Sequence, residues 1–344
     1  MGLLISKQTL GVAFTVFSGI GIVIMPTTAK IAHESGSDVI TIAFSRGIVA
    51  TVLLLLTLLA LREKLSLPKA LIRSSLVAGM GGALFVYSIY GAIIYTNISL
   101  VILIIYMYPM SLAVYEHLMG NTRLSVNQWI FASMATLGLA FIVGVELGEI
   151  NLFGILLALL GMVGCVIVTL ANHKVTDRIG SLRSNLYMSL WSAIIFCFIL
   201  LFWGDFQEPD SVIGWASLGV NGIGYCIAWV AFFSGARILG ATRASMITLI
   251  DPPMSALISW IIFNELLTIY QWIGFAVVMV SLIAFEAQAR AQQSEAAITT
   301  PDHQDSAPAR STYPVDPSNR SARNILTRGN PNKIKGNKTR NHRD

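Results

Sequence analysis

The sequence has little charge. Only 12% of its 344 residues are Asp, Glu, Lys or Arg, whereas 55% are hydrophobic. Soluble domains carry roughly 25% charged residues, so the composition excludes an ordinary soluble protein. Apolar stretches of about 20 residues, long enough to cross the ~30 Å hydrocarbon core of a bilayer, recur along the chain. We therefore expect an all-α integral membrane protein.

Catalytic and metal-binding motifs are also missing. The three cysteines, Cys165, Cys197 and Cys226, lie in apolar stretches without CxxC spacing, which predicts free core thiols. His33-Glu34 lacks the second histidine of HExxH, and the sequence has no GxSxG or Walker A loop. We expect no catalytic residue, no metal and no cofactor, with an integral-membrane lipid enzyme as an open alternative.

The net charge of +5 resides in one segment. Residues 1–287 hold 13 basic and 13 acidic residues, whereas residues 288–344 hold 10 basic and 5 acidic ones. This last segment has too few apolar residues to fold alone and is predicted to be a disordered basic tail. Basic tails beside membranes set topology and attract anionic lipid. We expect no nucleic acid partner.

The apolar stretches predict ten transmembrane helices in two groups of five. The expected spans are Leu10–Ile31, Val39–Leu61, Leu71–Ile94, Ser99–Gly120, Val126–Val145, Leu152–Ala171, Leu186–Phe202, Val212–Phe233, Ala244–Phe263 and Ile269–Phe285. They divide the chain into residues 9–145, residues 151–287 and the tail.

The distribution of Lys and Arg in the short connections predicts the orientation. The side of the N-terminus carries Lys7, Arg62, Lys64, Lys69, Arg73, Arg123, Lys174, Arg178, Arg183, Arg237 and Arg243. The other side carries only Lys30. The positive-inside rule then places both termini in the cytoplasm of a bacterial inner or plasma membrane.

An internal repeat relates the two groups of spans. Pro-Met-Ser occurs at 109–111 and again at 253–255, and Gln-Trp-Ile occurs at 128–130 and 271–273. Five spans per half force the second half to insert upside down, which predicts two inverted five-helix repeats. Inverted repeats are typical of secondary transporters, whose substrate site lies between the halves near mid-membrane. A membrane scaffold or receptor that uses the basic tail is the open alternative.

The same features resemble a known family. An Arg in the second span, a Pro in the fourth and ninth spans, and Glu265-Leu-Leu-Thr-Ile-Tyr-Gln271-Trp272-Ile-Gly274 after the ninth resemble tandem EamA-domain proteins of the drug/metabolite transporter superfamily. The first half departs from the pattern, with Asn121 near the Glu position and Phe131 at the Gly position. The resemblance implies alternating access for a small organic metabolite or drug-like solute, proton-coupled or by exchange.

Asp251 is the first candidate site residue. It lies in the ninth expected span, followed directly by Pro252 and Pro253. An ionisable group in hydrocarbon is costly and is a functional candidate by default. The two prolines, like Pro109 in the fourth span, remove backbone donors and are expected to bend their helices. A structural partner for Asp251 and purely packing kinks are the alternatives.

Polar and aromatic residues complete the candidate site. Arg46 in the second span is expected to reach partway toward Asp251 or to extend to the outer headgroups. Aromatic and amide side chains near the expected cavity suit a substrate with apolar and polar parts, or form belts and packing contacts. They are Tyr87, Tyr90, Tyr106, Tyr108, Asn221, Tyr225 and Trp229. A small-molecule substrate and membrane lipid are the expected partners, and homodimerisation is allowed.

Overall fold

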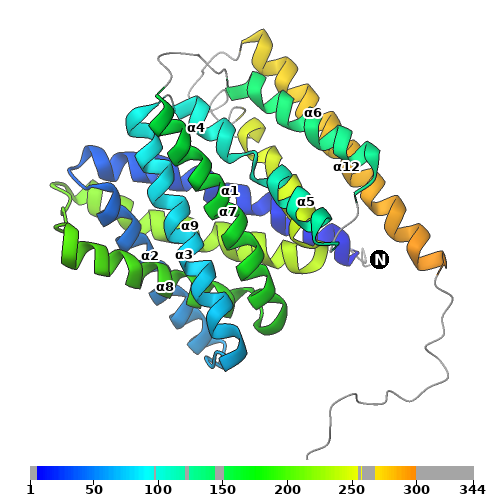
Figure 1. The fold of residues 1–344 in the computed structure, drawn as a ribbon. Coiled ribbons are helices and arrows are strands. Elements are labelled where there is room, and N and C mark those ends of the chain that lie inside the picture. The colour runs from blue at the N-terminus through cyan, green and yellow to red at the C-terminus, as the bar shows by residue number, and fades with distance from the viewer. Residues whose placement is uncertain are drawn as a thin grey trace, which may run out of the picture. The chain divides into compact units, whose positions relative to one another are not determined.

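The computed structural model describes residues 6–96, 98–120, 124–143, 151–254, 257 and 268–299, in which all regular secondary structure is helical (Figure 1). The helices are α1 (Lys7–Glu34), α2 (Val39–Ala60), α3 (Lys69–Tyr95), α4 (Ile98–Ile105), α5 (Tyr108–Leu118), α6 (Val126–Val143), α7 (Leu152–Ile179), α8 (Ser181–Trp203), α9 (Val212–Leu239), α10 (Ala241–Ile247), the 3-10 turn η1 (Thr248–Ile250) and α12 (Ile269–Thr299).

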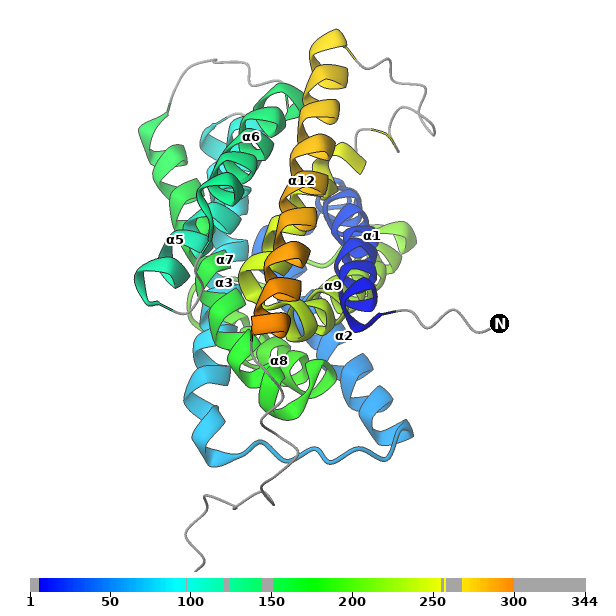
Figure 2. The ribbon, with the colours of Figure 1, turned by 90° about the vertical axis from the view of Figure 1, so that its right-hand side faces the viewer.

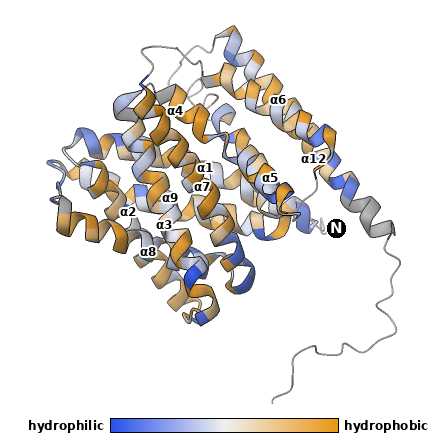
Figure 3. Ribbon diagram, viewed as in Figure 1, coloured by the Kyte–Doolittle hydropathy of each residue, from blue (hydrophilic) through white to orange (hydrophobic). Residues whose placement is uncertain are grey.

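Eight helical stretches of the described residues are long and apolar enough to span a bilayer, and Val126–Ile142 is a shorter apolar helix. They coincide with nine of the ten expected spans. The remaining one, at 244–263, falls on α10, η1 and helical residues 251–254, and its last part lies outside the described residues. Leu56, Leu137, Val280 and Ile283 expose 57 to 64% of their surface, as side chains facing lipid do. Figure 3 shows hydrophobic residues along the helices and hydrophilic ones concentrated near the connections.

Two helices end on a single glycine and the next helix begins at once. Gly180 separates α7 from α8 and Gly240 separates α9 from α10, with φ of 87° and 88°. This region of backbone space, with ψ near 160°, is essentially restricted to glycine. The helices therefore extend further than expected: Lys174, Arg178 and Arg237, expected in loops, lie within α7 and α9.

The repeated Gln-Trp-Ile has a structural explanation. Gln128 accepts a hydrogen bond from the backbone N–H of Ser125 at 2.9 Å, and Gln271 accepts one from Thr268 at 2.8 Å. In return, each Ser or Thr hydroxyl accepts the Gln backbone N–H at 3.3 Å. Both are capping boxes, which satisfy two backbone donors at a helix N-terminus. The repeat thus marks the equivalent starts of α6 and α12.

Helices from the two halves pack against each other in matching pairs. α1 packs along α9, and α3 packs along α7. If α1 corresponds to α7 and α3 to α9, as the repeat requires, the two pairs are equivalent. α2 packs against α8, its own counterpart in the other half. Figure 2 shows α1 close to α9, and α3 and α7 together.

Glycines make these equivalent contacts close. A Cβ at Gly21 would collide with the backbone of Gly224 and Ala228, and one at Gly164 would collide with that of Gly81 and Phe85. Gly164 lies 143 residues after Gly21, and Gly224 and Ala228 lie 143 residues after Gly81 and Phe85. Small residues allow such close backbone approach between membrane helices. The two crossings therefore use the same positions of the repeat.

We expect Gly21→Ala to destabilise the protein by about 1–3 kcal/mol, because the added methyl would lie 2.6 Å from the backbone nitrogen of Ala228. The matched control is Gly219→Ala, since a Cβ at Gly219 meets nothing within 4 Å. That substitution should be neutral or stabilising by up to about 1 kcal/mol through helix propensity. Thermal unfolding of the purified variants in detergent measures both. Equal stability of the two variants would contradict the close crossing.

The C-terminal helix is longer than expected. α12 continues to Thr299, so residues 288–299, which we had assigned to the disordered tail, are helical. Within them Arg290 pairs with Glu286 at 3.1 Å. Residues 300–344, the rest of the expected tail, lie outside the described residues.

Candidate functional site

Two helices are interrupted at repeat-equivalent positions. α4 ends at Ile105, and α5 begins at Tyr108, one residue before Pro109. In the second half, α10 ends at Ile247, and a 3-10 turn leads into a new helical segment at Asp251. Pro252 has no N–H for the carbonyl of Thr248, and the N–H of Asp251 donates to that carbonyl instead. Both interruptions lie next to the prolines, and the bends expected there stay a prediction.

The two interruptions meet. The Tyr108 hydroxyl lies 2.7 Å from the Thr248 hydroxyl, and both residues are buried. The Thr248 hydroxyl also donates to the Ser245 carbonyl, at 2.7 Å. Tyr108 is therefore at the contact between the broken helices, with Pro109 and Pro253 buried beside it. Unwound backbone near mid-membrane is tolerated where protein or a cavity surrounds it.

Asp251 lies beside this contact without a polar partner among the described residues. Its side chain is 1% exposed, and neither carboxyl oxygen has a hydrogen bond there. It rests against Gly19 of α1, where a Cβ would come within 2.7 Å of its Oδ1. The side chains of Tyr106 and Tyr108 are close enough to interact electrostatically with the Asp251 carboxyl group. An unpaired charge in such a place is costly, so the site favours a carboxyl group that is protonated or neutralised by a ligand.

Arg46 projects into the bundle from α2. It is 8% exposed, and its guanidinium carbon lies 4.7 Å from the ring centroid of Tyr225, midway along α9. The interpretation that Arg46 extends to the headgroups does not match this placement. Within the described part of the chain it forms no ion pair with Asp251 or any other carboxylate. Gly224 of α9 packs on Gly21 of α1, and Asp251 packs on Gly19, two residues earlier in α1. Tyr225 and Asp251 therefore lie at similar levels along α1.

Aromatic side chains from α3 and α9 gather around Arg46. Trp229 packs edge-on against Phe85 at 6.4 Å between ring centroids and lies 6.1 Å from Tyr225. Tyr90 is within electrostatic range of Arg46 and packs on neighbouring core clusters. Tyr225 and Trp229 therefore adjoin each other, Tyr90 lies near Arg46, and Tyr106 and Tyr108 lie near Asp251.

Two of the proposed residues have other surroundings. Tyr87 is 51% exposed, whereas Tyr90, three residues further along α3, is half-buried, so the placement of both in one shared cavity stays a prediction. Asn221 donates to the Met25 carbonyl at 2.7 Å and to the Thr28 hydroxyl at 2.9 Å. Its amide nitrogen therefore connects α9 to α1. Its side-chain carbonyl oxygen is buried and has no hydrogen-bond partner among the described residues.

A buried ionic network that the sequence did not predict lies at the start of α10. Arg243 is 7% exposed and contacts both carboxyl oxygens of Glu286 on α12, at 2.5 and 2.8 Å. Thr242 donates a hydrogen bond to Glu116 of α5. The sequence feature that could have predicted the network is the position of Glu116 and Glu286 at the ends of apolar runs. The network ties the fourth, ninth and tenth expected spans together.

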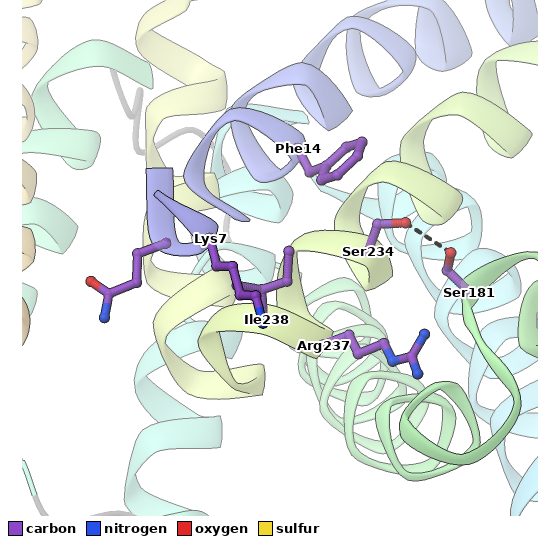
Figure 4. A pocket seen from close by; sticks show the side chains of 7 residues that line it. Lys7, Phe14, Ser181, Ser234, Arg237 and Ile238 are labelled. Carbon is purple, nitrogen blue, oxygen red and sulfur yellow. Dashed lines mark hydrogen bonds between the residues drawn. The ribbon is translucent and has the colours of Figure 1, made fainter. Parts of the chain in front are cut away.

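A surface hollow of about 510 Å³ lies where α1 begins and α9 ends (Figure 4). Its lining includes the cations Lys7 and Arg237, and Ser181 and Ser234, whose hydroxyls are 2.8 Å apart. A neighbouring hollow of about 340 Å³ shares Ser181 and Arg237. Neither hollow is lined by Asp251 or Arg46.

Comparison with known protein families identifies one family. A family model described as "EamA-like transporter family" matches residues 9–144 and 152–285. A curated "Uncharacterized transporter" from Archaeoglobus fulgidus is 23% identical over 266 residues, which are 76% of this chain and 92% of the relative. A solved structure described only as "Crystal structure of protein" has a TM-score of 0.65 at 14% identity, covering 81% of this chain and 98% of its own. The last likeness concerns the fold alone.

Proposed function

Because the chain belongs to the EamA-like transporter family, with two EamA domains in tandem, we propose that it is a secondary transporter of a small organic solute. It works by alternating access of two inverted five-helix repeats and is not an enzyme. The paired crossings of α1 with α9 and of α3 with α7 support this mechanism, since they give the halves equivalent surfaces on which to rock.

The observation that carries the proposal is the meeting of two broken helices beside an unpartnered carboxyl group. Tyr108 and Thr248 join the interruptions, and Asp251 follows Thr248 by three residues. Discontinuous helices at a repeat interface are where transporters bind substrate and coupling ions. Asp251 is our candidate for proton coupling or recognition, Pro109, Pro252 and Pro253 shape the site, and Arg46 and the tyrosines contact the solute.

The function is tested by comparing metabolites in cells with the chain, cells without it, and cells with residues 1–299 only. We expect one or a few solutes to change between cells and medium, and the change to survive removal of residues 300–344. The truncation keeps Arg290 and its ion pair with Glu286. A scaffold that depends on the basic tail would instead lose its effect with the tail, and a new lipid product would indicate an enzyme.

We propose that both termini lie in the cytoplasm. A cysteine introduced at Lys64, between α2 and α3, or at Arg178, near the end of α7, should react with a membrane-impermeant thiol reagent only from the cytoplasmic side. A cysteine at Glu208, between α8 and α9, should react only from outside. The background is a chain without Cys165, Cys197 and Cys226, which are free thiols. The reverse labelling pattern would overturn the orientation.

A further inference from the structure

Arg46 has a buried positive charge that no described residue neutralises. The residue is 8% exposed, and the ion pairs of the described residues all lie elsewhere. Asp251, at a similar level along α1, has no polar partner among these residues and does not pair with Arg46. An arginine in a membrane interior is expensive unless it is paired or hydrogen-bonded, so this one calls for a counter-charge.

The contacts of Arg46 leave its hydrogen-bonding edge available. The guanidinium carbon lies over the Tyr225 ring, 4.7 Å from its centroid, and the hydrogen bonds of the described residues include none from Arg46. Its N–H donors point outward in the guanidinium plane, in the fork that binds a carboxylate with two parallel hydrogen bonds. The described residues supply no hydrogen-bond acceptor to this fork.

The surroundings also suit an apolar group attached to such an anion. Trp229 stands next to both Tyr225 and Phe85, whose ring centroids lie 6.1 and 6.4 Å from its own. Trp229 and Phe85 are both half-buried, whereas Tyr225 is buried. Ligand sites combine aromatic walls with a few placed polar groups in this way.

We propose that the transported solute is a small organic carboxylate whose carboxyl group binds Arg46 and whose apolar part packs on the aromatic side chains of α3 and α9. This inference rests on the proposed transport function and assigns the substrate class to the same site. The solute supplies the missing counter-charge, and Asp251 remains free for a proton.

The test measures binding to the purified full-length protein with matched probes. Acetate, phenylacetate and indole-3-acetate are each compared with the corresponding amide, which has nearly the same shape without the charge. 2-Phenylethylamine represents the opposite charge. Calorimetry and the ligand-induced rise in thermal midpoint are the readouts. We expect phenylacetate and indole-3-acetate to bind roughly 10- to 100-fold more tightly than their amides, as hydrogen bonds to a charged group allow.

Variants at position 46 assign the effect to the arginine. Arg46→Met should abolish the preference for carboxylates, and Arg46→Lys should keep part of it because the charge remains. Loss of folding is not expected to mask the result, since replacing an unneutralised buried charge by an apolar side chain costs little stability. Arg73→Met, which removes an exposed arginine of α3, is the matched control and should bind like the unmodified protein.

Three results would overturn the inference: amides binding as tightly as carboxylates, a preference that persists in Arg46→Met, or no binding of any carboxylate. Transport is judged separately, by the metabolite comparison. A neutral or cationic solute that is transported and insensitive to Arg46→Met would refute the carboxylate assignment and leave the transport function standing. Carboxylate binding at Arg46 without movement of any solute would refute transport instead.

Discussion

Asp251→Asn is expected to reduce solute accumulation driven by a pH gradient to the level of protein-free liposomes. Asparagine has nearly the same shape but cannot bind and release a proton, which is the role we propose for this residue. Neither oxygen of Asp251 has a hydrogen-bond partner among the described residues, so the substitution breaks no contact there. The measurement is uptake by proteoliposomes under an imposed pH gradient, with the solute that the metabolite comparison identifies.

Two comparisons separate coupling from damage to the protein. Asp205→Asn removes an exposed carboxylate between α8 and α9 and should leave uptake unchanged. Exchange of solute in the absence of a pH gradient should survive in Asp251→Asn, because that reaction needs no net proton movement. Unaltered gradient-driven uptake by Asp251→Asn would exclude a role for this carboxyl group in coupling.

Arg243→Gln is expected to destabilise the protein by about 3 kcal/mol, because it removes one partner of a buried ion pair. The side chains of Arg243 and Glu286 are 7% and 16% exposed, and two hydrogen bonds join them. The loss should lower the thermal midpoint by several degrees, measured on purified protein in detergent. It should also weaken transport, since the pair holds the start of α10 against α12.

Glu286 supplies its own control. Arg290 contacts the same carboxylate at 3.1 Å but is 47% exposed. An exposed pair one turn apart contributes well under about 1 kcal/mol, so Arg290→Gln should have little effect. If Arg243→Gln and Arg290→Gln reduced stability by similar amounts, burial would not be what decides how much each ion pair contributes.

Most of the fold could be predicted from the sequence because helix positions in a membrane depend on local hydrophobicity. Nine of the ten expected spans coincide with apolar helices of the described residues, and the family resemblance is confirmed by the match over both halves. The helix ends were less predictable. A single glycine at 180 or 240 allows the chain to turn within one residue, so charged residues such as Arg178 and Arg237 extend the helices instead of forming loops.

The site was only partly predictable because residue type does not reveal which side of a helix faces the core. Tyr87 and Tyr90 are three residues apart, yet Tyr87 is 51% exposed, whereas Tyr90 is within range of Arg46. The reach of Arg46 to Tyr225 depends on how α2 crosses α9, which no local pattern encodes. The partnership of Arg243 with Glu286 likewise depends on a contact between residues 43 positions apart.

The glycine crossings set an order for biogenesis. Gly164 is synthesised 83 residues after its partner Gly81, whereas Gly224 is synthesised 203 residues after its partner Gly21. At about 5 to 20 residues per second, α3 waits roughly 4 to 17 s for α7, and α1 waits roughly 10 to 40 s for α9. The contacts that Gly21 and Gly81 make with the second half are therefore absent until that half is synthesised. Each crossing joins a helix of the first half to one of the second, so neither crossing can form before the second half is synthesised.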